Sequence, residues 1–241
     1  AFTETEMRAG KTHANWVNNQ DGYCANWLDA RETQGLEPRI SKNVLGSVYV
    51  EGTADVEPYK FSLALAHASE QLGTSIQHGN VIGLRKKTGR ITGVLLKNEE
   101  ISCDALVLAM GPWANWASDW LNLQIPIRPL KGQIIRLQIP GIPLSYSVGW
   151  NGNYATSKPD GLVWAGTTEE EAGFNETITS TSRDIIMRSL INMLPSLSES
   201  QLTQQTACLR PVSNDGLPIL GTIPNVKGVY IATGGARTGI T

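Results

Sequence analysis

The chain has 241 residues, of which 41% are hydrophobic and 17% are charged, and its formal net charge is -2. This composition is typical of globular proteins, it offers no basic surface for nucleic acid, and no apolar run is long enough to span a bilayer. We therefore expect a small-molecule ligand, and neither nucleic acid nor a membrane as a partner.

The N-terminal part of the chain predicts mainly helices. Residues 4–18 and 23–34 are polar with scattered tryptophan and alanine, which favours two helices that end at Gly35. Residues 46–51 alternate as a strand does. Residues 57–73 give the clearest helix, because a proline stands near its start, apolar residues recur at helical spacing and a glycine ends it.

Short strands are predicted next. One lies near Ser75, two at residues 81–86 and 91–97 are joined by a turn, and another covers residues 105–110. The helix expected after residue 110 would carry three tryptophans on one face, which indicates packing. Strands and helices therefore alternate in this region, as they do in α/β proteins.

The second half of the chain predicts an antiparallel sheet. Residues 127–137 and 154–168 favour strands, and proline, asparagine and glycine in the intervening segments favour chain reversals. Residues 182–194 are amphipathic and end before Pro195, so we expect a core helix. Three consecutive glutamates, residues 169–171, cannot share one face of an element and predict a solvated turn.

The last predicted strand, residues 229–232, is apolar and runs into Gly234, Gly235 and Gly239. Glycine allows positive φ and close backbone approach. A helix that begins after such a strand presents unpaired N–H groups to a ligand. The segment is therefore a candidate cradle for a phosphate or an electron-rich ring.

Several ordered motifs carry a resemblance to a known family. The run from Arg210 to Gly221 (Arg-Pro-x-x-x-Asp-Gly-x-Pro-x-x-Gly) is similar to the C-terminal signature of the D-amino acid oxidase family of FAD-dependent oxidoreductases, and residues 234–240 match the end of that signature. The glycine oxidase and sarcosine oxidase-like branch is most similar. Further matches precede the signature in the family's order, at residues 55–58, 106–114, 128–133, 154 and 166–174.

The resemblance implies a mixed α/β fold, in which part of an FAD-binding sheet with helices is intergrown with an antiparallel substrate-binding sheet. A helical segment would cover residues 1–35 and a strand of the substrate domain residues 36–56. The FAD-binding domain would take residues 57–126 and 222–241, and the substrate sheet and its helix residues 127–221. The family opens with a Gly-x-Gly-x-x-Gly turn, which this sequence lacks. We therefore expect a fragment of a longer enzyme, without that N-terminal motif and without the C-terminal helix.

The implied activity is oxidation of an amino acid or secondary amine to the imine, with FAD as cofactor. Arg210 matches the family's substrate-binding arginine, and a guanidinium can hold a carboxylate through two parallel hydrogen bonds. The alternative is a structural ion pair with Asp215. Tyr154 matches a tyrosine of the substrate pocket, and packing on the sheet is its alternative. No residue is assigned as catalytic.

The resemblance also implies the residues that bind FAD. Val81 matches a backbone position that contacts the adenine, and Gly111 and Pro112 match a turn close to the dinucleotide. The final run matches the segment around the flavin, with an arginine near the ring: Gly234, Gly235, Ala236, Arg237, Thr238, Gly239 and Ile240. An ordinary strand end is the alternative at these positions. The family carries a bulky pair where this chain has Gly235 and Ala236, so glycine as the substrate stays open.

Cys208 lies where the sarcosine oxidase branch carries a cysteine bonded covalently to FAD. A free cysteine that only packs is the favoured alternative. With Cys24 and Cys103 it forms an odd count without a Cys-x-x-Cys pair, which argues against a disulfide framework and a zinc site. We expect a reducing compartment, and hence the cytoplasm.

Two other functions stay open. The chain could be a non-catalytic scaffold, or a subunit of a multi-chain amine dehydrogenase whose FAD motif comes from a partner subunit. A homo-oligomer also stays open. The sequence does not distinguish an oxidase from a dehydrogenase, and it does not select one amine or amino acid.

Overall fold

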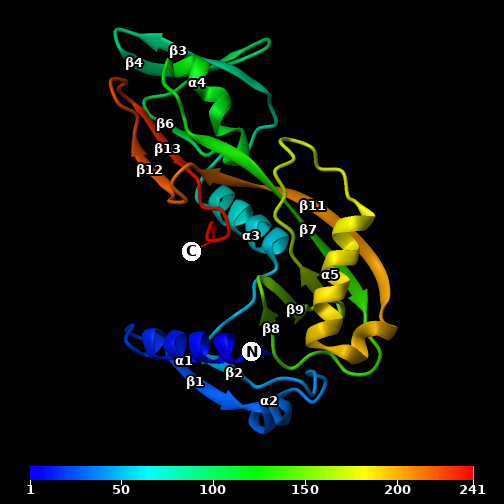
Figure 1. The fold of residues 1–241 in the computed structure, drawn as a ribbon. Coiled ribbons are helices and arrows are strands. Elements are labelled where there is room, and N and C mark those ends of the chain that lie inside the picture. Colours follow the sequence, from blue (N-terminus) through cyan, green and yellow to red (C-terminus); the bar gives the residue numbers. More distant parts are fainter. Residues whose placement is uncertain (241) are drawn as a thin grey trace. The chain divides into compact units, whose positions relative to one another are not determined.

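A computed structural model describes residues 1–240 and divides into two compact units (Figure 1). The first unit contains residues 1–68, 133–168 and 178–206, and the second contains residues 69–132, 169–177 and the chain from Ala207 onward. Helices and sheets occur in both units, which confirms the predicted mixed α/β class. None of the helices in the described part of the chain has the length and apolar composition that a membrane crossing needs.

The first unit begins with two helices and a two-stranded antiparallel ribbon, β1–β2. Their bounds are α1 (Glu4–Asn18), β1 (Cys24–Asp29), α2 (Ala30–Leu36) and β2 (Gly46–Glu51). The predictions of α1 and β2 are confirmed. The helix predicted over residues 23–34 is wrong in its first half, because residues 24–29 pair along their whole length with β2 and bury Ala25. Cross-strand packing overrides the local helical preference there.

A five-stranded sheet forms the centre of the first unit, in the order β11-β7-β10-β9-β8. Its strands are β7 (Ile127–Gln138), β8 (Val148–Trp150), β9 (Asn153–Ser157), β10 (Val163–Gly166) and β11 (Gln201–Ser213). The pairs β7–β10, β10–β9 and β9–β8 are antiparallel, as predicted for this half of the chain. Two strands of this sheet also contribute to the second unit. Residues 127–132, at the start of β7, and residues 207–213, at the end of β11, belong to it.

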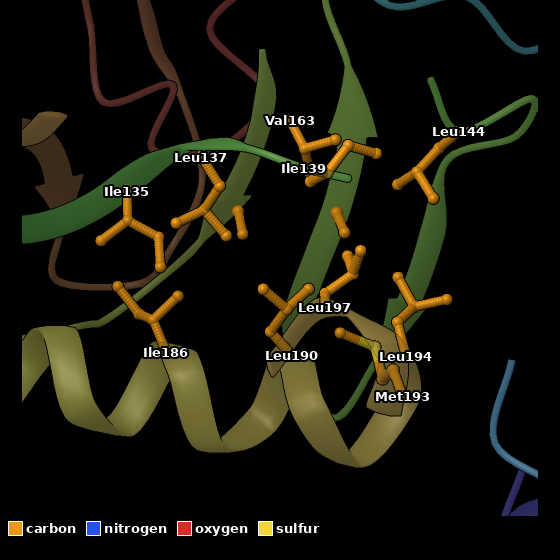
Figure 2. Close-up of a cluster of buried hydrophobic side chains, with 12 residues drawn as sticks. Ile135, Leu137, Ile139, Leu144, Val163, Ile186, Leu190, Met193, Leu194 and Leu197 are labelled. Carbon is orange, nitrogen blue, oxygen red and sulfur yellow. The ribbon is translucent and has the colours of Figure 1, made fainter. Parts of the chain in front are cut away.

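Helix α5 (Ser180–Met193) and the short 3-10 helix η2 (Pro195–Glu199) cover the apolar side of this sheet. Figure 2 shows Ile186 and Leu190 of α5 pointing toward Ile135 and Leu137 of β7, and Met193 of α5 at the other end of the same cluster. All five side chains are almost completely buried. Burial of apolar area of this kind is the main stabilising contribution to the unit, and the predicted role of this helix in the core is confirmed.

The N-cap of α5 is also tied to the sheet. The Thr179 hydroxyl accepts from the Ser182 N–H and from Gln133 Nε2, each at 3.3 Å. We expect Thr179→Ala to lower the free energy of unfolding by about 1–2 kcal/mol, because a helix N-cap and a buried amide both lose an acceptor. Urea unfolding measures this loss. Ser180→Ala, at the exposed first helical position, is the control, and an equal loss in both variants would contradict the capping role.

Asp55 fixes the connection between β2 and helix α3 (Pro58–Gln71). Its carboxylate accepts hydrogen bonds from Ser147 and, at 2.8 Å, from Thr156 Oγ1, and it lies 3.6 Å from Lys158 Nζ. Burial raises the pKa of Asp55, but the hydrogen bonds from Ser147 and Thr156 and the charge of Lys158 outweigh it, so the pKa lies below its ordinary value.

The lowered pKa of Asp55 gives a pH-dependent contribution to stability. The ionised form is favoured in the folded state, so the contribution is present above the unfolded pKa of about 3.9 and is lost as pH falls through the folded pKa. We expect Asp55→Asn to lower the urea midpoint at pH 7, and the difference from the wild type to shrink as the pH falls below about 4. A difference that stays constant down to pH 3 would contradict this assignment.

The second unit contains two three-stranded sheets. One is the antiparallel meander β3 (Val81–Lys87), β4 (Arg90–Leu96) and β5 (Glu100–Ser102). The other has the order β12-β13-β6, with β6 (Leu106–Leu108), β12 (Ile219–Thr222) and β13 (Val229–Thr233). The hairpin of β3 and β4 and the strands β6 and β13 are confirmed. The strand predicted near Ser75 is wrong, because residues 74–80 have no regular structure.

The helix predicted after residue 110 is confirmed with one difference. The segment after β6 starts as the 3-10 helix η1 (Gly111–Trp116), whose second residue is proline, and becomes the α-helix α4 (Ala117–Leu121). Apolar residues from this segment, β6 and β13 form the core of the unit, including Leu108, Ala114, Ala117, Val229 and Ile231. This core fixes the ends of β6 and β13, where the candidate site lies.

Candidate functional site

Two parallel strands of the second unit end side by side. β6 pairs with β13 in parallel along residues 106–108, so their carboxyl ends meet at one edge of the sheet (Figure 1). Gly111 follows β6 with a φ of +53°, and its carbonyl accepts a hydrogen bond from Thr233 Oγ1 at 3.0 Å. The turns that start at Gly111 and Gly234 therefore lie next to each other. Ligands of open α/β sheets bind outside this edge.

The glycine run after β13 closes into a tight turn. Gly234 has a φ of +81°, and a Cβ on Gly235 would lie 2.7 Å from the Cα of Gly239, so side chains are excluded at both positions. The Ala236 N–H donates to the Pro211 carbonyl at 3.0 Å, and the Thr238 N–H to the Gly235 carbonyl at 2.7 Å. These two N–H groups already donate to carbonyl groups of the protein. A backbone cradle for a ligand would therefore use other N–H groups of the run.

Arg210 lies on β11 and is held against β7. A Cβ on Gly132 would lie 2.3–2.5 Å from Nη1, Nη2 and Cζ of Arg210, so the guanidinium occupies the space that any other residue at position 132 would fill. Gly132 was missed by the sequence reasoning. A glycine in the interior of a long strand is the signal that could have found it, because such a glycine marks a close approach by another group.

The sequence also allows an ion pair between Asp215 and Arg210. Its Oδ1 accepts from the Leu217 N–H at 3.0 Å. That hydrogen bond, together with one from the Ser213 side chain, holds the pKa of Asp215 below its ordinary value. The carboxylate thus stabilises its own turn between β11 and β12.

Three ion pairs organise the glutamates that follow β10. Glu169 Oε1 lies 2.8 Å from Arg237 Nε, Glu170 Oε2 lies 3.4 Å from Lys131 Nζ, and Glu171 pairs with Arg128. Lys131 is only 2% exposed and also donates to the Thr177 carbonyl. The predicted solvated turn holds for Glu169, which is exposed, but is wrong for Glu170, because the buried cation of Lys131 on β7 draws its carboxylate inward.

Val81 borders an apolar hollow of the second unit. The hollow has a volume of about 360 Å³ and is lined mainly by β3, β6 and the tryptophans Trp113, Trp116 and Trp120. Val81 is partly exposed there, whereas Pro112 is buried in the first turn of η1. An apolar hollow with exposed rings suits the flat face of an aromatic base, so the residues present fit the adenine end of FAD.

Tyr154 belongs to the first unit and is the second residue of β9. Its cross-strand neighbours are Gly149 on β8 and Gly166 on β10. Neither neighbour has a side chain, and Tyr154 itself is partly buried. A role of Tyr154 in the substrate pocket stays a prediction.

Cys208 lies on β11, two residues before Arg210. Alternate residues of a strand share a face, so the two side chains project from the same side of β11. Cys208 is a free, exposed cysteine, and its role stays a prediction. Exposure gives a thiol access to a ligand, which covalent attachment requires.

Comparison with known proteins gives one family for the whole chain. The model of the family DAO, FAD dependent oxidoreductase, matches residues 1–241. The glycine oxidase of Pseudomonas aeruginosa is 30% identical over 87% of this chain, and the hydrogen cyanide synthase subunit HcnC of the same organism is 32% identical over 89%. This chain spans 58% of the first relative and 52% of the second.

A solved structure agrees with the fold. The crystal structure of glycine oxidase from Bacillus cereus superposes with a TM-score of 0.92 and 26% identity. The superposition covers all of this chain and 67% of that one. The fold of this chain is therefore shared with an enzyme of known structure.

Proposed function

The chain belongs to the DAO family of FAD dependent oxidoreductases, and from that premise we propose that the protein oxidises the C–N bond of an amino acid or secondary amine to an imine. This membership confirms the family inferred from the sequence. The observation that carries the proposed activity is the position of the Arg210 guanidinium, which packs on Gly132. Val212, two residues after Arg210, forms a β-bridge with Gly235 in the glycine turn after β13. The proposed substrates are of the glycine, sarcosine or D-amino acid type.

FAD is the proposed cofactor, and when bound it would accept the hydride from the substrate. Gly111, Pro112 and the run from Gly234 to Ile240 would hold it where β6 and β13 end. Val81 would contact its adenine from the apolar hollow. Two features support this fit: glycine turns with positive φ admit a ligand close to the backbone, and the hollow is lined by apolar and aromatic side chains.

Arg210 would bind the carboxylate of the substrate. A guanidinium that grips both carboxylate oxygens restricts the position of the adjacent α-carbon, and this alignment lowers the entropic part of the barrier. The hydroxyl of Tyr154 would donate a hydrogen bond to the ligand. Two similar proteins are glycine oxidases by name, which supports glycine, and the small residues Gly235 and Ala236 support room for an N-substituted amine.

Flavin absorbance tests the proposed function. The purified protein is supplied with FAD, and its spectrum is recorded from about 350 to 500 nm. Glycine, sarcosine or D-alanine is then added without oxygen. We expect two flavin bands that a substrate bleaches, and no bleaching by the matching amines without a carboxylate, such as methylamine. Bands that remain with acid-precipitated protein would indicate covalent attachment, for which Cys208 is the candidate, whereas a protein that binds no flavin would support the scaffold.

A subunit role is the second candidate, because one relative is a synthase subunit by name. In that case flavin would bind only when a partner chain with a Gly-x-Gly-x-x-Gly motif is present. Tagged protein purified from its native host distinguishes the two: flavin bound by the isolated chain supports the single-chain enzyme, and flavin that appears only with a second chain supports the subunit. The free cysteines support the proposed reducing, cytoplasmic location.

A further inference from the structure

Three segments of the second unit meet at Gly132 of β7 and place Arg210, Gly132 and Glu169 in one row. Lys131 and Glu170 exchange two backbone hydrogen bonds, of 3.0 and 2.9 Å, in an antiparallel bridge. The antiparallel register therefore places Glu169 opposite Gly132, in the type of pair whose side chains are closest. Directly opposite residues project from the same face. The guanidinium of Arg210, which comes from the neighbouring strand β11, covers this same face of Gly132.

Glu169 brings a second cation into this row. Its carboxylate holds Arg237 Nε at 2.8 Å. The backbone of Arg237 is anchored beside Arg210 in turn, because the neighbouring Ala236 donates to Pro211 and Gly235 bridges to Val212. The face around Gly132 thus carries two arginines, and the carboxylate of Glu169 neutralises one of them.

We propose that the ion pair between Glu169 and Arg237 makes the site selective for amines with a single carboxylate. This inference rests on the proposed function, in which Arg210 anchors that carboxylate. A second carboxylate on the substrate would meet the negative charge of Glu169, and Arg237 would be engaged already. Like charges in close contact raise the cost of binding, so Glu169 excludes dicarboxylates by repulsion.

The chain offers a matched control in the same segment. Glu171 pairs with Arg128 two residues further on, and both side chains are about half exposed or more. Glu171→Gln removes the same charge as Glu169→Gln but leaves the row across Gly132 intact. Glu169 and Arg237 are themselves about half exposed, so loss of their ion pair has little effect on folding.

The experiment uses two ligands that cannot be oxidised at a C–N bond. Methoxyacetate carries one carboxylate and oxydiacetate carries two, with an ether oxygen in place of the amine. Their dissociation constants are measured by calorimetry on the flavin-loaded protein, for the wild type and for the variants Glu169→Gln, Glu171→Gln and Arg210→Ala. Turnover of sarcosine and iminodiacetate provides a second measurement.

We expect the wild type to prefer methoxyacetate, and Glu169→Gln to shift the preference toward oxydiacetate by about tenfold, since a released arginine can pair with the second carboxylate. Glu171→Gln should leave the ratio unchanged, and the double variant Glu169→Gln/Arg237→Met should lose the gain. Equal shifts in both glutamine variants, or no shift in Glu169→Gln, would overturn the inference while the proposed function stands. Binding that survives Arg210→Ala, or no binding by the wild type, would overturn both.

Discussion

Replacing Arg210 with alanine is expected to weaken binding of an amino acid substrate by about 30-fold or more, with an upper range in the thousands. Removal of one partner of a desolvated charge pair costs about 2–5 kcal/mol, and each 1.4 kcal/mol is tenfold in affinity. Lysine should recover only part of the loss, because an ammonium cannot grip both carboxylate oxygens. KM for the substrate and the dissociation constant of methoxyacetate measure the effect.

Arg188→Ala is the control for that experiment, because Arg188 is an exposed residue of α5. Its KM should equal that of the wild type. If Arg210→Ala binds methoxyacetate as tightly as the wild type, the carboxylate anchor is elsewhere. If Arg210→Ala instead loses folding stability with no change in affinity, the arginine has the structural role that the sequence left open.

Replacing Gly132 with alanine should raise KM by about tenfold to 100-fold, because misplacement of a binding group by about 1 Å can cost that much. The new Cβ would lie 2.3–2.5 Å from three atoms of the Arg210 guanidinium, so the two cannot coexist. Those atoms are the end of a flexible side chain, and the chain can relieve the clash when Arg210 moves. The free energy of unfolding should therefore change little compared with the loss of affinity.

Gly83→Ala provides a matched control for this prediction. Gly83 also lies within a strand of the second unit, and a Cβ there would meet Leu95 Cδ1 at 3.6 Å, an ordinary contact. Both alanine variants should unfold at similar urea concentrations, and only Gly132→Ala should lose affinity. A Gly132→Ala protein with unchanged KM would show that Arg210 binds the substrate from a different rotamer or does not bind it.

Local signals in the sequence were sufficient for much of the fold. Thr88 and Gly89 carry the positive φ values that the turn between β3 and β4 requires, and glycine at such a turn is recognisable without a structure. The core helix α5 shows its apolar period, and the strand β13 shows its apolar run before the glycines. The family motifs added the expectation that Arg210 and residues 234–240 share a site.

Other predictions failed where distant residues decide the conformation. Residues 24–29 form a strand only because β2 offers them a partner edge. The strand expected near Ser75 is absent from residues 74–80, and a short polar segment of this kind has little local preference of its own.

The sequence alone determined the periodicity of the elements, the turn positions and the family, since these depend on neighbours in the chain. Only the tertiary structure decided that Gly132 lies beneath Arg210, that the buried Lys131 pairs with Glu170, and that Glu169 pairs with Arg237, a residue 68 positions away. Such contacts are fixed by strand register, and a slip of one residue would turn each side chain to the other face of the sheet. No local pattern contains that register, because it is set by the packing of whole strands against each other.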